Sequence, residues 1–225
     1  MNPIKTLALA GVAAIAFSYS ANAAIITDSD SLGPQTTELM SGLDTLTVDL
    51  FDTMGGTRTL NKVTLTLDAR IDTDGTVTNN AAQAQSFTVQ VNSNFSSTGG
   101  PAPIGSLLAN VQVGPQAFNN LGVGASAPFG PSIATGQAMP MFTNAGDLAA
   151  FTGVGTFSIG LDTLSGQSIL GGGGNITAAI NTEASATLTV EYDYTTTPVG
   201  VSEPATLAMG GLALLGMVAL RRRAA

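Results

Sequence analysis

The 225-residue chain contains no cysteine, no histidine and no tryptophan. Without cysteine it can form neither a disulfide nor a thiolate site, and without histidine it lacks the commonest general base and metal ligand. Ser-His-Asp and Cys-His catalytic arrangements are therefore excluded, as are the usual zinc, copper and haem sites. Because tryptophan is also missing, only tyrosine and phenylalanine could stack on a sugar ring.

Basic residues are scarce as well. Between positions 24 and 200 only Arg58, Lys62 and Arg70 are basic, against fourteen acidic residues, so this segment carries a formal charge of −11. Such a surface repels nucleic acid, which we exclude as a partner. It is compatible with solubility, with association of cations and with contact to neutral glycans.

The N-terminus has the composition of a secretory signal peptide. Lys5 supplies a positive charge, residues 7–17 form a short apolar run, and Ala21-Asn22-Ala23 fits a cleavage site of small residues. We predict a signal helix in residues 1–23, cleavage specified by Ala21 and Ala23, and a mature chain that begins at Ala24. The apolar run is short for a permanent membrane span.

A second apolar run, residues 205–220, lies near the C-terminus and is followed by Arg221, Arg222 and Arg223. Sixteen helical residues rise about 24 Å, less than the roughly 30 Å of a hydrocarbon core, so this transmembrane segment is marginal unless the arginines snorkel. By the positive-inside rule the three arginines act as a stop-transfer signal and residues 221–225 stay in the cytoplasm. The body of the protein then lies outside the cytoplasm.

Immediately before this run stands Val201-Ser202-Glu203-Pro204. The motif, the apolar run and the arginines together resemble a PEP-CTERM sorting signal, although the usual form is Val-Pro-Glu-Pro and Ser202 departs from it. The resemblance implies that an exosortase-like transpeptidase recognises and removes the tail. It also implies a Gram-negative, exopolysaccharide-producing bacterium, transient anchoring in the inner membrane, and delivery to the cell surface or extracellular matrix.

The body alternates apolar and polar residues with a period of two, the pattern of half-buried strands. The clearest example is Lys62–Ile71, and seven phenylalanines are core candidates. We predict an all-β fold, an antiparallel β-sandwich of about 7–10 strands, with a helical turn at Asp147–Phe151. Gly-, Pro- and Ala-rich residues 96–140 suggest long loops or edge excursions, and residues 171–174 a flexible loop. The other predicted strands are 46–50, 87–91, 107–113, 157–161, 176–180 and 188–194.

Three segments of the body resemble the choice-of-anchor E domain: Leu60–Leu67, Leu148–Thr156 and Ala186–Tyr194. The resemblance runs from about residue 44 to 197 and supplies no catalytic residues. The expected domain order is a signal peptide at 1–23, a lead-in at 24–43, the sandwich at 44–197, a linker with the sorting motif at 198–204, the transmembrane segment at 205–220 and the basic tail at 221–225.

Two further patterns have functional alternatives. Asp72-Thr73-Asp74-Gly75 resembles the start of an EF-hand loop, but the positions for the remaining ligands hold Arg70 and Ala81, so a hairpin turn is the better interpretation. A looser calcium site that includes Asp28 and Asp30 stays open. Tyr192 and Tyr194 share one face of the last strand, where core packing is a better interpretation than a sugar platform.

These observations predict no enzyme, no cofactor and no metal site. We expect a structural or interaction protein of the cell surface or exopolysaccharide matrix, with exopolysaccharide or other matrix components as partners. The alternatives are a carbohydrate-binding or calcium-assisted adhesin and, behind it, a glycosidase that uses two carboxylates.

Overall fold

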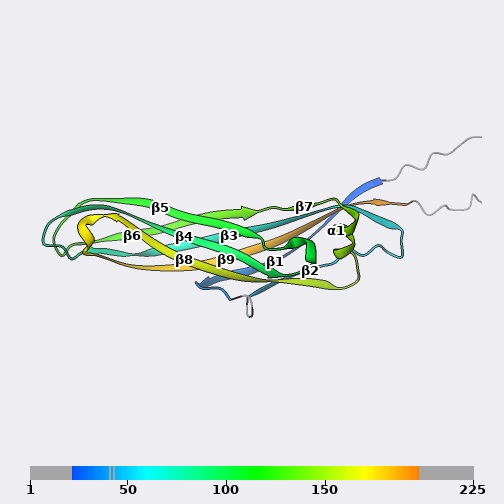
Figure 1. Ribbon diagram of the computed structural model, residues 1–225, viewed down its shortest axis with the longest axis horizontal. Coiled ribbons are helices and arrows are strands. Elements are labelled where there is room, and N and C mark those ends of the chain that lie inside the picture. Colours follow the sequence, from blue (N-terminus) through cyan, green and yellow to red (C-terminus); the bar gives the residue numbers. More distant parts are fainter. Residues whose placement is uncertain (1–21, 41, 43, 198–225) are drawn as a thin grey trace, which may run out of the picture. The chain divides into compact units, whose positions relative to one another are not determined.

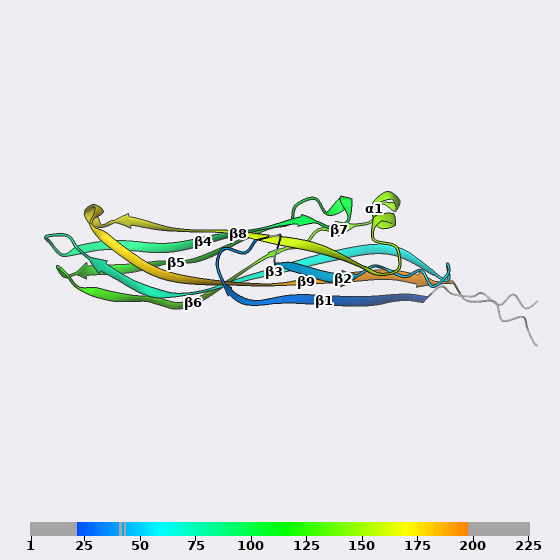
Figure 2. The ribbon, with the colours of Figure 1, turned by 90° about the horizontal axis from the view of Figure 1, so that it is seen from below.

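The computed structural model describes residues 22–40, 42 and 44–197, of which Ala23–Thr196 form one compact unit. The unit is a sandwich of two antiparallel β-sheets, as the sequence predicted (Figures 1 and 2). The described strands are β1 (Asn22–Thr36), β2 (Thr45–Asp49), β3 (Arg58–Asn79), β4 (Gln85–Gly99), β5 (Leu108–Leu121), β6 (Ser126–Ala138), β7 (Met141–Phe142), β8 (Thr156–Gly171) and β9 (Ile176–Thr196). The helices are the 3₁₀ turns η1 (Ala102–Ile104) and η2 (Gly172–Gly174), and α1 (Ala145–Ala150).

One sheet has the strand order β1-β9-β3-β6, with β7 also on β3, and the other has the order β2-β8-β4-β5. Strands β3 and β9 pair along their whole length, from Arg58 opposite Thr196 to Asn79 opposite Ile176. The 22 residues of β3 span roughly 70 Å at a rise of about 3.3 Å per residue. We call the end where β1 begins and β9 ends, beside α1, the proximal end, and the end with the β3–β4, β5–β6 and β8–β9 turns the distal end (Figure 1).

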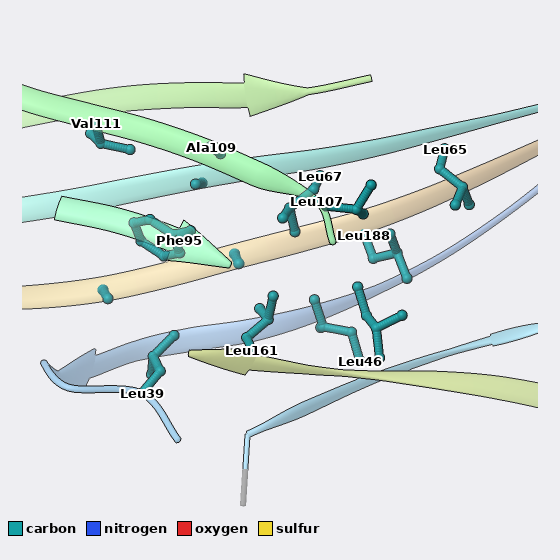
Figure 3. Packing of buried hydrophobic residues seen from close by; sticks show 14 of the residues in the cluster. Leu39, Leu46, Leu65, Leu67, Phe95, Leu107, Ala109, Val111, Leu161 and Leu188 are labelled. Carbon is teal, nitrogen blue, oxygen red and sulfur yellow. The ribbon is translucent and has the colours of Figure 1, made fainter. Parts of the chain in front are cut away.

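The core lies between the sheets and follows from the alternation in the sequence. In β3 the side chains of Val63, Leu65 and Leu67 are fully buried, while the intervening residues face outward. From the facing sheet, Leu46 and Leu161 pack toward the same layer (Figure 3). All seven phenylalanines predicted for the core are buried: Phe87, Phe95, Phe118, Phe129, Phe142, Phe151 and Phe157.

The two long sides of the sandwich differ. On one side β5 and β6 close the gap between the sheets: Gln116 Nε2 donates to the carbonyl oxygen of Pro128 at 3.0 Å, and the Gly130 amide donates to Gln116 Oε1 at 3.1 Å. A Cβ at Gly136 would collide with the carbonyl oxygen of Asn110 on β5, so glycine permits this close approach. On the other side β1 and β2 cover only the proximal parts of β9 and β8.

All predicted strands and the helical turn are present, but the strands are longer than expected. The predicted strands 176–180 and 188–194 are the two ends of β9, because the intervening alternation continues through alanine and serine. Residues 24–43, expected as a lead-in, contain most of the edge strand β1. The flexible loop expected at 171–174 is the tight 3₁₀ turn η2 between β8 and β9.

Two predictions need correction. Of the two alternatives for residues 96–140, long loops and edge excursions, the first is wrong, since the segment holds the end of β4 and the edge strands β5 and β6. Two Gly-Pro pairs of this segment, Gly114-Pro115 and Gly130-Pro131, lie in β5 and β6, which are edge strands where proline is tolerated. Asp72–Gly75 is not a hairpin turn but the middle of β3, where the pairing with β6 is irregular between Thr73 and Gly75.

Candidate functional site

Most of the residues predicted for sorting lie outside the described part of the chain. These are Ala21 of the signal cleavage site, Val201, Ser202, Glu203 and Pro204 of the sorting motif, and Arg221, Arg222 and Arg223 of the stop-transfer signal. Ala23 is described and is an exposed residue at the start of β1. Among the described residues, no helix is long and apolar enough to cross a membrane; the predicted segment 205–220 falls outside them.

At the proximal end a cavity of about 210 Å³ lies between β1, β2, β9 and the start of β3. Its buried wall is aromatic: the ring of Phe51 lies 5.5 Å from that of Tyr192 and 5.4 Å from that of Tyr194. The guanidinium carbon of Arg58 lies 5.2 Å from the centre of the Tyr194 ring, a cation–π contact. The two tyrosines are therefore core residues, as predicted, and the alternative of a sugar platform is wrong.

Tyr192 connects this core to β2. Its hydroxyl donates a 2.6 Å hydrogen bond to the carbonyl oxygen of Asp49, and the side chain is only 1 % exposed. Burial, followed by the negative charges of Asp28 and Asp49, raises the pKa of Tyr192 above its usual value. The neutral hydroxyl is thus the form that the fold stabilises.

This shift predicts an alkaline weakening of the fold. The contribution of the protonated tyrosine is complete below the unfolded pKa of about 10 and is lost as pH rises through the higher folded pKa, at up to about 1.4 kcal/mol per pH unit. We expect the free energy of unfolding of the wild type, measured with urea, to fall between pH 8 and pH 11 by about 1 kcal/mol more than that of Tyr192→Phe. Parallel pH curves for the two proteins would contradict the assignment.

The residues considered for calcium do not come together. Asp28 and Asp30 in β1 accept hydrogen bonds from the backbone amides of Asp49 and Thr47, at 2.7 and 2.8 Å, and so join β1 to β2. Asp72 in β3 pairs with Arg70, whose Nη2 lies 2.8 Å from its carboxylate. Within the described residues no three acidic side chains are grouped in a way that could hold a metal ion.

Charge is unevenly distributed along the sandwich. Strands β4, β5 and β6 contain no charged residue, and between Gly75 and Thr182 the only charged residues are Asp147 and Asp162. Because the turns of the distal end (Figure 1) also fall within this interval, these turns and the strands β4, β5 and β6 present an uncharged surface, whereas the neighbouring strands β3 and β9 carry Arg70, Asp72, Asp74 and Glu183 in their distal halves. This surface is rich in Asn, Gln, Ser and Thr.

A shallow hollow of about 430 Å³ lies on this surface where β4 and β8 pair, and we call it the outer hollow. The register sets Asn92 opposite Gly166 and Asn94 opposite Leu164. A Cβ at Gly166 would meet no atom within 4 Å, so the missing side chain leaves the middle of the hollow open. Leu164 is 69 % exposed and gives the hollow an apolar element.

Polar groups complete the outer hollow. Its lining residues are Asn92, Asn94, Leu164, Ser165, Gly166, Gln167 and Ser168. The Ser168 hydroxyl is shielded from solvent and has no hydrogen-bond partner among the described residues. Amides and hydroxyls beside an apolar side chain suit a neutral, hydroxyl-rich ligand, because each ligand hydroxyl can both donate and accept.

Comparison with known proteins identifies the tail. Residues 200–223 match the PEP-CTERM protein-sorting motif. No curated protein matches the chain. Among solved structures, the chain is similar to one of Mud crab tombus-like virus (9 % identity, 89 % of this chain and 97 % of that chain, TM-score 0.21). It is also similar to one of infectious bursal disease virus Gt strain (11 % identity, 97 % of this chain and 53 % of that chain, TM-score 0.16).

TM-scores this low support no conclusion about fold or function. The matched motif, in contrast, supports a conclusion about sorting. It contains Glu203-Pro204, the apolar run and the three arginines on which the sequence prediction rests. The chain is an exported protein whose C-terminal PEP-CTERM motif directs its processing by an exosortase and its sorting to the cell surface.

Proposed function

We propose that the sandwich is a non-enzymatic structural or interaction component of the bacterial cell surface or exopolysaccharide matrix, and that its outer hollow binds a neutral polysaccharide. The observation that carries the proposal is that strands β4, β5 and β6 have no charged residue. An acidic protein that used its whole surface only for solubility would have no reason to leave these three strands uncharged.

The outer hollow adds chemistry to this surface. Asn92 and Asn94 supply two amides from β4, and Leu164 supplies an apolar contact from β8. Binding through a few neutral hydrogen bonds is weak per site, which suits a protein held beside a polymer that repeats the same ligand many times. The resemblance of the body to the choice-of-anchor E domain belongs to the same proposal, because that family is named for its association with C-terminal anchors.

The test is co-sedimentation of the detergent-solubilised full chain with the exopolysaccharide of its own host. We expect saturable binding that weakens about tenfold or more in Asn92→Ala/Asn94→Ala, because two amide hydrogen bonds are lost. The matched control is Asn110→Ala/Asn119→Ala, which removes two exposed amides from β5 outside the hollow.

Equal weakening in both double variants, or no binding by the wild type, would overturn the polysaccharide proposal. Dependence of binding on added calcium would favour the calcium-assisted adhesin instead. Release of soluble sugar during the incubation would favour a glycosidase.

A further inference from the structure

Beside the outer hollow lies a second depression, the edge groove, of about 400 Å³, on the side of the sandwich that β1 and β2 leave open. The Thr37 amide donates to the carbonyl oxygen of Thr182 at 3.1 Å, just beyond the end of β1 at Thr36. In the described part of the chain, the residues of β9 before Thr182 therefore have β3 on one side and no strand on the other.

The backbone of this segment faces the open side at alternate residues. Both Thr182 and Ala178 accept hydrogen bonds from the side away from β3, the latter from Gln167 Nε2 at 3.5 Å. In an antiparallel ladder the amide and carbonyl of a residue point the same way and alternate along the strand. The backbone of Ile180 therefore faces outward as well, while Ala179 faces β3.

An edge of this kind is normally protected by charge, proline or a covering segment. The other edges have such protection: β1 carries Asp28, Asp30 and Pro34, β2 is five residues long, and β5 and β6 close on each other. The segment Leu164–Thr182, which supplies the β8 and β9 walls of the open side, has no charged residue and no proline. The charged residue that lines the edge groove is Glu38, which follows β1 and accepts a 2.9 Å hydrogen bond from the Ser165 amide of β8.

We propose that Ile176–Asn181 pairs antiparallel with the same segment of a second copy of this chain, across a twofold axis at Ala179. In that register Ala178 of each copy faces Ile180 of the other, and each such pair exchanges two backbone hydrogen bonds. Two sheets then join into one. This interaction concerns the edge of β9 and does not depend on the ligand of the outer hollow.

Electrostatics permits a second copy here although the chain is acidic. The nearest charged residue on β9 is Glu183, and the two Glu183 side chains would lie about 26 Å apart along the paired strands. That separation exceeds the Debye length of about 8 Å at physiological ionic strength, so their repulsion is screened.

Because the chain contains no cysteine, a single introduced cysteine reports on this pairing. The two copies of residue 179 would form a non-hydrogen-bonded pair with Cα atoms about 4.5 Å apart, within disulfide range. We expect the full-length Ala179→Cys chain, exported in its native host and mildly oxidised, to form a disulfide dimer. The matched control Ala117→Cys, at an exposed position on β5, should stay monomeric.

A second variant tests the backbone bonds. Proline at Ala178 removes an amide that faces away from β3, so the sandwich should keep its thermal stability while the Ala179→Cys dimer is lost. Three outcomes would each overturn the proposal. The Ala179→Cys chain could form no disulfide dimer, it could form no more dimer than the Ala117→Cys chain, or its cysteine could form a disulfide with a different protein. Persistence of the dimer in Ala178→Pro would overturn the strand pairing.

Discussion

Replacing Glu203 with alanine is expected to abolish release of the protein from the membrane. This chain shares Val201, Glu203 and Pro204 with the usual form of the sorting motif, which its residues 200–223 match. We propose that the exosortase recognises Glu203-Pro204. Intact-mass measurement of membrane and matrix fractions from the native host should show a wild-type matrix form that lacks the residues after about Glu203. Glu203→Ala should remain full length in the membrane.

The matched control is Ser202→Pro, which restores the usual Val-Pro-Glu-Pro form and should be processed at least as well as the wild type. Any extra mass on the new C-terminus of the matrix form would identify an acceptor to which the protein is joined. A wild-type chain found only in the membrane, with its tail intact, would show that the tail is an ordinary anchor in this host.

The largest effect on stability is expected for Tyr192→Ala. The ring is fully buried against Phe51, and its hydroxyl holds the backbone of Asp49. Removing a buried aromatic ring costs about 3–5 kcal/mol, which for a domain of this size lowers the melting temperature by roughly 6–20 °C. Tyr192→Phe keeps the ring and should cost only about 1 kcal/mol below pH 9.

Leu164→Ala provides the comparison for that measurement. Leu164 is 69 % exposed, so its truncation should change the free energy of unfolding by no more than about 0.5 kcal/mol. Calorimetric melting temperatures of Tyr192→Ala, Tyr192→Phe and Leu164→Ala rank the three variants by stability. A Tyr192→Ala protein as stable as Leu164→Ala would mean that the aromatic cluster does not hold β2 and β9 together.

The sequence was sufficient for the sandwich because its strands are amphipathic. The alternation in Lys62–Ile71 places Val63, Leu65 and Leu67 on one face of β3. A helix would not place alternate residues on a single buried face, so the pattern indicates a strand. The pattern could not locate the end of that strand. Asp72-Thr73-Asp74-Gly75 has the composition of a turn, but it continues the strand. Glycine is required at position 75 for close strand packing, because a Cβ there would collide with the backbone of Ala179 in the neighbouring strand.

The sorting motif and the outer hollow also differ in how far the sequence alone could predict them. The sorting motif is a contiguous stretch that is read as sequence, so its residues could be named from the sequence alone. The outer hollow joins Asn92 and Asn94 to Leu164 and Gly166, which lie about seventy residues apart and meet only through the β4–β8 register. A charge-free interval in the sequence was the one signal that could have pointed to it.

The long pairing of β3 with β9 also determines how the sandwich would carry mechanical load. Strand β9 ends at Thr196, and the sorting motif follows it in the chain. If the distal half is held by a polymer and the protein is held through its tail, tension acts along β9. The hydrogen bonds between Arg58–Asn79 and Ile176–Thr196 lie perpendicular to that force. They are then sheared together rather than unzipped one at a time, the geometry in which a β-ladder resists pulling best.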